Sequence, residues 1–274
     1  MSLVRTLRIL ASQRPSTPSR SVAAPSRVQR RRHGHTPVTW IDQELSGTAT
    51  IIHLHGGSYL RGESSQSWDW LEEVARRSGA AAAMVHFRLP PRHPFPAAIE
   101  DVLRVLDELT TRAVLRPGRW VLSGEGSGAG LALAVAQVLA SESLDSPAAV
   151  LLEAPWVDLS REDHGLEELL TAARLYAGPM PRTEPRLSPL RGELSGLPPV
   201  HVVTGAQDEL VEDSRRLAAA LAEAGAAHEH LEIPGAGGSV ATNGEGPAAQ
   251  QARRFQIAAV LEALGMDRSG VVRA

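Results

Sequence analysis

Short runs of apolar, strand-favouring residues alternate with longer helical patterns from about residue 48 to residue 264, and this alternation limits the possible folds more than any other feature of the chain. The helical stretches place apolar residues on one side, as Val102, Val105 and Leu109 do. Such alternation predicts a mostly parallel sheet with helices on both faces and a site at the carboxyl ends of the strands. The predicted strands are 48–55, 82–89, 119–124, 148–154, 200–204 and 228–233, with a candidate further strand at 37–42, and the predicted helices are 68–78, 97–112, 128–143, 209–225 and 247–264.

The charge divides the chain into two segments. Residues 1–41 hold eight Arg and no acid, whereas residues 42–274 hold 20 Arg and all 31 acidic residues. We therefore predict a basic tail over 1–41 and one large domain over 42–274. The tail is open to three interpretations: a solvated segment, an organelle-targeting peptide, or a basic arm for anionic surfaces. We expect a cytoplasmic protein, or an organellar one if residues 1–36 are a targeting peptide.

Composition excludes several classes of chemistry. The chain has no Cys, which excludes thiolate nucleophiles, Cys-ligated zinc and iron–sulfur clusters. Every basic residue among the 28 Lys and Arg is Arg, which excludes a Schiff-base lysine and a phosphate-loop lysine. No apolar run reaches 18 residues, so we expect no membrane-spanning helix. We also expect no cofactor, no metal and no nucleic-acid partner; a homodimer is an open alternative.

Three loops that follow predicted strands carry residues suited to a binding site. His55-Gly56-Gly57 follows the first strand, and its glycines leave backbone N–H groups free to point into a pocket. The turn at 124–130 is rich in glycine and leads directly into a helix, which is typical of a turn that presents a nucleophile or holds an anion. Asp208 stands at the end of a later strand, where it either serves the site or caps the next helix.

These loops and four further segments resemble the hormone-sensitive-lipase-like branch of the α/β-hydrolases, a family of serine esterases. The resemblance covers about residues 48–264. Its motifs occur in the family's order: 55–57, 87–101 (FRLPPRHPFPAAIED), 155–159 (PWVDL), 187–190 (LSPL) and 196–200 (GLPPV). The resemblance implies an α/β-hydrolase fold. Because residues 1–36 are too short and too polar for the family's N-terminal helical cap, we expect that cap to be reduced or absent, with the pocket open or roofed by residues 160–180.

The resemblance also assigns catalytic positions, and two of them are occupied by glycine. Gly126 stands where the family has its nucleophilic serine, and Gly238 stands where it has its histidine. Asp208 matches the family's acid, and His55, Gly56, Gly57 and Ser127 match its oxyanion and binding positions. The loop's third glycine is replaced by Ser58.

Alternative residues could restore chemistry at this site. Ser127 is one residue beyond the nucleophile position. The histidines that follow Asp208, His228 and His230, fall within a predicted strand rather than in the loop beyond it, and His55 or His93 would have to come from elsewhere. Glu125 could act as a general base on water.

Two further residue patterns have a structural interpretation beside the functional one. His53 with His55, and His228 with His230, have a spacing seen in metal sites but lack a carboxylate cluster. Tyr59, Trp68 and Trp70 either line a pocket or pack in the core.

The sequence therefore predicts an α/β-hydrolase-fold protein that is catalytically silent or severely impaired and keeps a pocket for a small ester- or carboxylate-bearing ligand. The alternative is an active carboxylic-ester hydrolase that uses Ser127.

Overall fold

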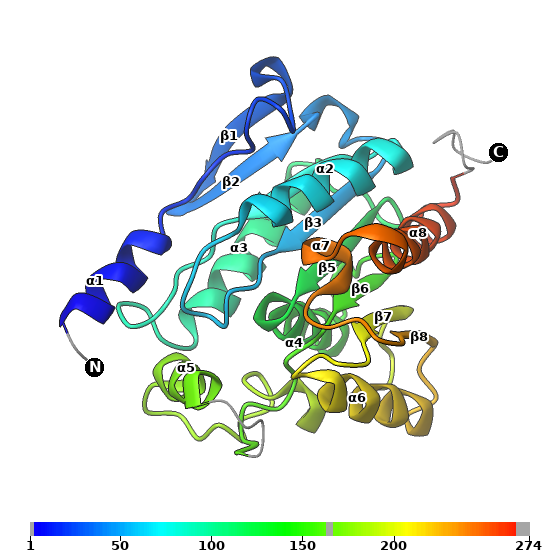
Figure 1. Cartoon of the computed structure of the whole chain (residues 1–274). Coiled ribbons are helices and arrows are strands. Elements are labelled where there is room, and N and C mark those ends of the chain that lie inside the picture. Colours follow the sequence, from blue (N-terminus) through cyan, green and yellow to red (C-terminus); the bar gives the residue numbers. More distant parts are fainter. Residues whose placement is uncertain (1–2, 163–166, 267–274) are drawn as a thin grey trace.

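The computed structural model describes residues 3–162 and 167–266, and side chains from residue 8 onward, and its centre is one eight-stranded sheet (Figure 1). The strand order is β1-β2-β4-β3-β5-β6-β7-β8. β2 pairs antiparallel with β1 and β4, and the remaining pairs are parallel. The strands are β1 Val28–His33, β2 Thr36–Ile41, β3 Thr50–Leu54, β4 Ala81–Val85, β5 Trp120–Glu125, β6 Val150–Glu153, β7 Val200–Gly205 and β8 His228–Ile233.

Helices pack on both faces of this sheet and bury two hydrophobic cores. One core lies under α3, α4, α5 and α6, and the other lies under α2, α7 and α8. Short 3₁₀ turns occupy Pro25–Arg27, Gln43–Leu45 and Pro189–Arg191. The helices are α1 Leu3–Ser12, α2 Ser65–Ser78, α3 Ala97–Thr111, α4 Ser127–Ser141, α5 Glu167–Ala177, α6 Val211–Glu223, α7 Val240–Asn243 and α8 Gly246–Ala263.

The predicted alternation is confirmed. Each of the six main predicted strands and the candidate strand at 37–42 corresponds to an observed strand, and each of the five predicted helices corresponds to an observed helix. The core strands β3 and β4 are buried along their whole length, as expected of parallel strands covered on both faces. The apolar spacing predicted for 97–112 is also confirmed, since Val102, Val105 and Leu109 are all buried in α3.

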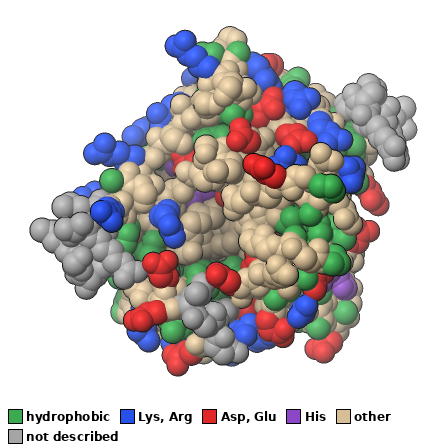
Figure 2. All heavy atoms as spheres, viewed as in Figure 1, with side chains coloured by type: hydrophobic (Ala, Val, Ile, Leu, Met, Phe, Trp, Pro, Cys, Tyr) green, Lys and Arg blue, Asp and Glu red, His purple; other side chains and the backbone are tan. Residues whose placement is uncertain are grey.

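The predicted domain boundary at residue 42 is wrong. β1 and β2 precede it and form the edge of the sheet, and Trp40 in β2 is fully buried. The misleading signal is the run Arg30, Arg31 and Arg32, whose side chains are exposed along β1, where arginine gathers on the surface in Figure 2. Charged residues on an edge strand prevent pairing with other chains, and here they give a strand the composition of a tail.

The remaining N-terminal segment packs against the loop that follows β3. The amide of Gly62 donates to the carbonyl of Ser12 at 2.9 Å, and Gln13 Nε2 donates to the carbonyl of Leu60 at 3.0 Å. Further along, Ser16 Oγ donates to Glu63 Oε1 at 2.7 Å. This short segment braces the loop from outside, with α1 as its only described helix.

Among the described residues, no helix is long and apolar enough to cross a membrane.

Candidate active site

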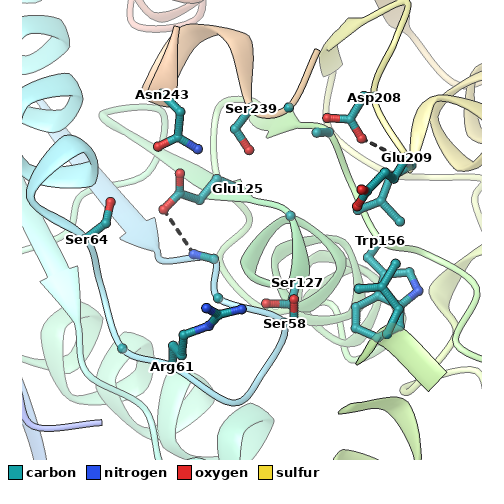
Figure 3. Close-up of a pocket in the computed structure, with 18 residues that line it drawn as sticks. Ser58, Arg61, Ser64, Glu125, Ser127, Trp156, Asp208, Glu209, Ser239 and Asn243 are labelled. Carbon is teal, nitrogen blue, oxygen red and sulfur yellow. Dashed lines mark hydrogen bonds between the residues drawn. The ribbon is translucent and has the colours of Figure 1, made fainter. Parts of the chain in front are cut away.

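A cavity of about 420 Å³ lies beside the carboxyl ends of β3, β5, β6 and β7, and this face of the molecule is hollowed near its centre in Figure 2. α5 contributes Leu169 to the wall, so part of the 160–180 segment lines the cavity as expected. Six of the seven predicted site positions line it and are drawn together in Figure 3: Gly56, Gly57, Gly126, Ser127, Asp208 and Gly238.

Gly126 forms the sharp turn between β5 and α4. Its backbone has φ 52° and ψ −115°, and its carbonyl accepts a hydrogen bond from the amide of Trp156 at 3.0 Å. A Cβ built on Gly126 would meet no atom within 4 Å. Gly126 therefore turns the chain sharply and leaves open space where a side chain would project.

The neighbouring glycines are required by close packing. A Cβ on Gly128 would overlap the carbonyl oxygens of Leu54 and His55, and a Cβ on Gly124 would overlap the carbonyl of Gly128. These contacts hold the first turn of α4 directly against the end of β3.

The loop after β3 turns through three successive residues with positive φ: Gly57 at 101°, Ser58 at 53° and Tyr59 at 59°. The amides of Gly57 and Ser58 donate no hydrogen bond to any described residue, and both residues line the cavity. The amide of Gly56 is already engaged, since it donates to Glu125 Oε1 at 3.1 Å. The loop thus offers the free N–H donors of Gly57 and Ser58, whereas that of Gly56 is not available to a ligand.

His55 is the predicted site residue that does not line the cavity. Its ring is 1% exposed and stacks on Phe87 with 4.4 Å between ring centroids. Its Nδ1 donates to the carbonyl of Gly56 at 2.8 Å, and burial lowers the pKa of the imidazole. His55 therefore supports the glycine loop from behind.

Ser127 lies at the first residue of α4 and is 2% exposed. Its Oγ accepts a hydrogen bond from the amide of Tyr59 at 3.0 Å, which ties the helix to the glycine loop. No histidine lines the cavity among the residues that the structure describes. A hydroxyl without a base to take its proton is a weak nucleophile.

Asp208 and Gly238 lie on neighbouring loops beyond β7 and β8. The amide of Gln207 donates to the carbonyl of Ala236 at 2.8 Å, which holds the two loops together. Gly238 has φ 60°, and a Cβ built there would meet no atom within 4 Å. Asp208 Oδ1 accepts a hydrogen bond from the amide of Leu210 at 2.6 Å, within the turn before α6. α6 begins at Val211 and has no side-chain cap, so the alternative that Asp208 caps the next helix is wrong. Burial raises the pKa of Asp208.

Glu125 forms another wall of the cavity and is 6% exposed. Its Oε1 accepts from Ser67 Oγ at 2.5 Å as well as from Gly56. Beneath it lies Glu153, which is 2% exposed and accepts from the amide and the hydroxyl of Thr242 in α7. Burial, and then the charge of Glu125, raises the pKa of Glu153 to about 7.

The other histidines considered above lie away from the cavity. His53 contacts Ser123 Oγ at 2.8 Å, and burial lowers its pKa to about 3. His228 and His230 lie within β8, which confirms their predicted place in a strand. In the described part of the chain no three or more potential ligands cluster as a metal site would require.

The three aromatic residues that the sequence assigned either to a pocket or to the core belong to the hydrophobic core. Trp68 and Trp70 belong to the core beneath α2, and their indole N–H groups donate to Ser16 Oγ and Gln256 Oε1. Tyr59 stacks on Tyr176 with 3.6 Å between ring centroids. Trp156, which sequence reasoning did not single out, lines the cavity instead.

Comparison with known proteins matches this arrangement to a family. A family model described as the alpha/beta hydrolase fold matches residues 51–240, which is more than half of the chain. The chain belongs to this α/β-hydrolase family. An acetyl-hydrolase of Streptomyces hygroscopicus is 36% identical over 205 residues, which cover 70% of this chain and 68% of that protein. An esterase of Acinetobacter venetianus is 31% identical over 189 residues, covering 64% of this α/β-hydrolase and 62% of the esterase, which is less than two thirds of its length.

Solved structures agree with the assignment to the hormone-sensitive-lipase-like branch. The crystal structure of a hormone-sensitive lipase from a metagenome library aligns with a TM-score of 0.80 and 25% identity, covering 95% of this α/β-hydrolase and 92% of that chain. The fold and the family expected from the motifs are therefore confirmed.

Sequence reasoning missed several lining residues of this α/β-hydrolase. Arg61, Ser239 and Asn243 point into the cavity region in Figure 3, and Glu153 lies behind it. Glu153 could have been found, because it ends the apolar run of β6 at the same edge as Glu125 in β5. Arg61 and Ser239 lie in loops and Asn243 ends the four-residue helix α7, and these segments have no sequence pattern of their own.

Proposed function

We propose that this α/β-hydrolase binds a small ester-like molecule in the cavity and does not hydrolyse it by serine chemistry. The observation that carries the proposal is the pair Gly126 and Gly238. Both line one cavity with Asp208, and both have empty space where the family's serine and histidine side chains would project. The related acetyl-hydrolase and esterase support an ester-like ligand.

The magnitude of the loss follows from how such residues work. Nucleophile, base and acid act as a unit, so removing one member costs nearly as much as removing several. What remains is the acceleration of about 10³–10⁴-fold over water that binding and the free N–H donors can supply. The amides of Gly57 and Ser58 are such donors.

The second candidate function is ester hydrolysis with Ser127 as nucleophile, because Ser127 lines the same cavity. The hydrogen bond from the amide of Tyr59 to its Oγ argues against it, since that bond occupies a lone pair of the oxygen and fixes its direction.

Turnover of short-chain p-nitrophenyl esters by the wild type and by Ser127→Ala separates the two candidates. We expect the same low rate for both proteins, with Ser141→Ala, at an exposed serine at the end of α4 away from the cavity, as the control. A rate that falls tenfold or more in Ser127→Ala alone would refute the proposal in favour of the serine esterase.

A further inference from the structure

Two buried carboxylates face the cavity with an oxygen that no protein group satisfies. Glu125 is 6% exposed and Asp208 is 8% exposed, and both line the cavity. Each uses one oxygen for its protein hydrogen bonds: Oε1 of Glu125 and Oδ1 of Asp208. Oε2 of Glu125 and Oδ2 of Asp208 accept no hydrogen bond from any described residue. In Figure 3 the two carboxylates flank the cavity, with Ser239 between them.

The charge of the lining is negative. Glu125, Asp208 and Glu209 face one cation, Arg61. Arg61 is exposed, and among the described residues it forms no ion pair with any of these carboxylates. A ligand carboxylate would be repelled here, because charges a few ångströms apart interact strongly where water is largely excluded.

The pKa of Asp208 reflects the shortage of positive charge in the cavity. Burial raises its pKa first of all, the amide of Leu210 lowers it, and the charge of Glu209 raises it again. No cation is among the groups that shift the pKa of Asp208. Among the described residues, the ionised form of Asp208 therefore has no cation paired with it, although its side chain is largely buried. A charge in such a position is stabilised by a partner of opposite sign. Beside Asp208, Gly238 leaves open the space that a side chain would fill.

We propose that the cavity takes a ligand with a cationic nitrogen, an ammonium, amidinium or imidazolium group, which donates to Asp208 and Glu125. This inference rests on the proposed function and narrows its ligand class, because it disfavours the carboxylate-bearing ligand expected from sequence. The apolar part of the ligand lies against Trp156, Leu169 and Leu210, which line the same cavity. Pockets of this kind join an apolar wall to a few polar groups that fix orientation.

Isothermal titration with three probes of the same shape tests the charge preference: benzylamine, benzyl alcohol and phenylacetate, at pH 8 and low salt, with the full chain. Benzylamine is protonated at this pH. We expect benzylamine to bind at least tenfold more tightly than benzyl alcohol, and phenylacetate to bind more weakly than either.

Variants locate the binding. We expect Asp208→Asn and Glu125→Gln each to weaken benzylamine binding at least fivefold while leaving benzyl alcohol binding within twofold. Glu223→Gln, at an exposed carboxylate at the end of α6, should leave both unchanged. A melting curve for each variant establishes that it is folded.

The proposal is overturned if phenylacetate or benzyl alcohol binds as tightly as benzylamine, if neither substitution weakens benzylamine binding, or if no probe binds. These probes contain no ester and report binding alone. Failure here is therefore distinguishable from failure of the proposed function, which would show as turnover that depends on Ser127.

Discussion

The amide of Gly56 donates to Oε1 of Glu125 at 3.1 Å, so the residue before the β5–α4 turn holds the glycine loop in place. The same oxygen accepts from Ser67 in α2. Glu125 thereby joins three segments that border the cavity. Removing the Glu125 carboxylate would leave the Gly56 amide and the Ser67 hydroxyl buried without an acceptor.

We predict that Glu125→Ala destabilises the fold by about 1–3 kcal/mol, because it orphans the donors of Gly56 and Ser67. Glu125→Gln keeps an acceptor for both groups and should cost less than half as much. Urea unfolding monitored by circular dichroism measures the difference. Equal losses for the two variants would show that the hydrogen bonds at Oε1 do not hold the loop.

The glycines of the turn should differ sharply in their tolerance of a side chain. Gly128→Ala places a Cβ against the carbonyls of Leu54 and His55 and should cost about 3 kcal/mol or more. Gly126→Ala meets open space and should cost only about 1–2 kcal/mol, from its positive φ. Thermal melting of both variants tests the contrast, and the reverse order would contradict the packing described for α4.

Stability should depend on pH through Glu153. Its pKa is raised from 4.5 to about 7 in the folded protein, first by burial and then by the charge of Glu125. A raised carboxyl pKa means that the folded state holds its proton more tightly, so the contribution is full below pH 4.5 and is lost as pH rises through about 7. A shift of this size corresponds to about 3 kcal/mol.

We therefore expect Glu153→Gln to remove a fall in unfolding free energy between pH 5 and pH 8, measured by denaturant titration at each pH. Glu125→Gln, which removes a cause of the raised pKa, should move the same fall to lower pH. A wild-type profile that is flat over this range, or unchanged in Glu153→Gln, would contradict the assignment.

The central sheet could be predicted because local pattern and tertiary environment agree there. β4 is apolar throughout, β3 is apolar except at Thr50 and His53, and both strands are fully buried in the structure. β1 could not be predicted, because Arg30, Arg31 and Arg32 lie on an exposed edge where nothing demands apolar residues. Composition alone makes such a strand resemble a tail.

The site could be predicted as far as sequence motifs reach. Gly126, Asp208 and Gly238 are positions in loops whose neighbours match a family pattern, and they line one cavity as expected. The charge of the cavity could not be predicted in this way. It depends on Glu209 and Arg61, which come from different loops, and on which oxygen of Glu125 is already bonded.

Placing a serine at residue 126 and a histidine at residue 238 should restore ester hydrolysis if the site has the geometry of an esterase. We predict that Gly126→Ser with Gly238→His raises p-nitrophenyl acetate hydrolysis at least about 10²-fold over wild type, whereas either substitution alone gives little, since the groups act as a unit. Adding Asp208→Asn to the double variant should reverse most of the gain. A double variant that folds and shows no gain would contradict the assignment of these positions.

Under the proposed function, the chain has no activated serine in this cavity. The most direct measurement is intact-mass spectrometry after exposure to excess fluorophosphonate, with peptide mapping of any adduct and the Gly126→Ser, Gly238→His variant as the positive control. We expect no adduct on the folded wild type and one adduct, at residue 126, on the variant. A stoichiometric adduct on Ser127 of the wild type would refute the proposed function.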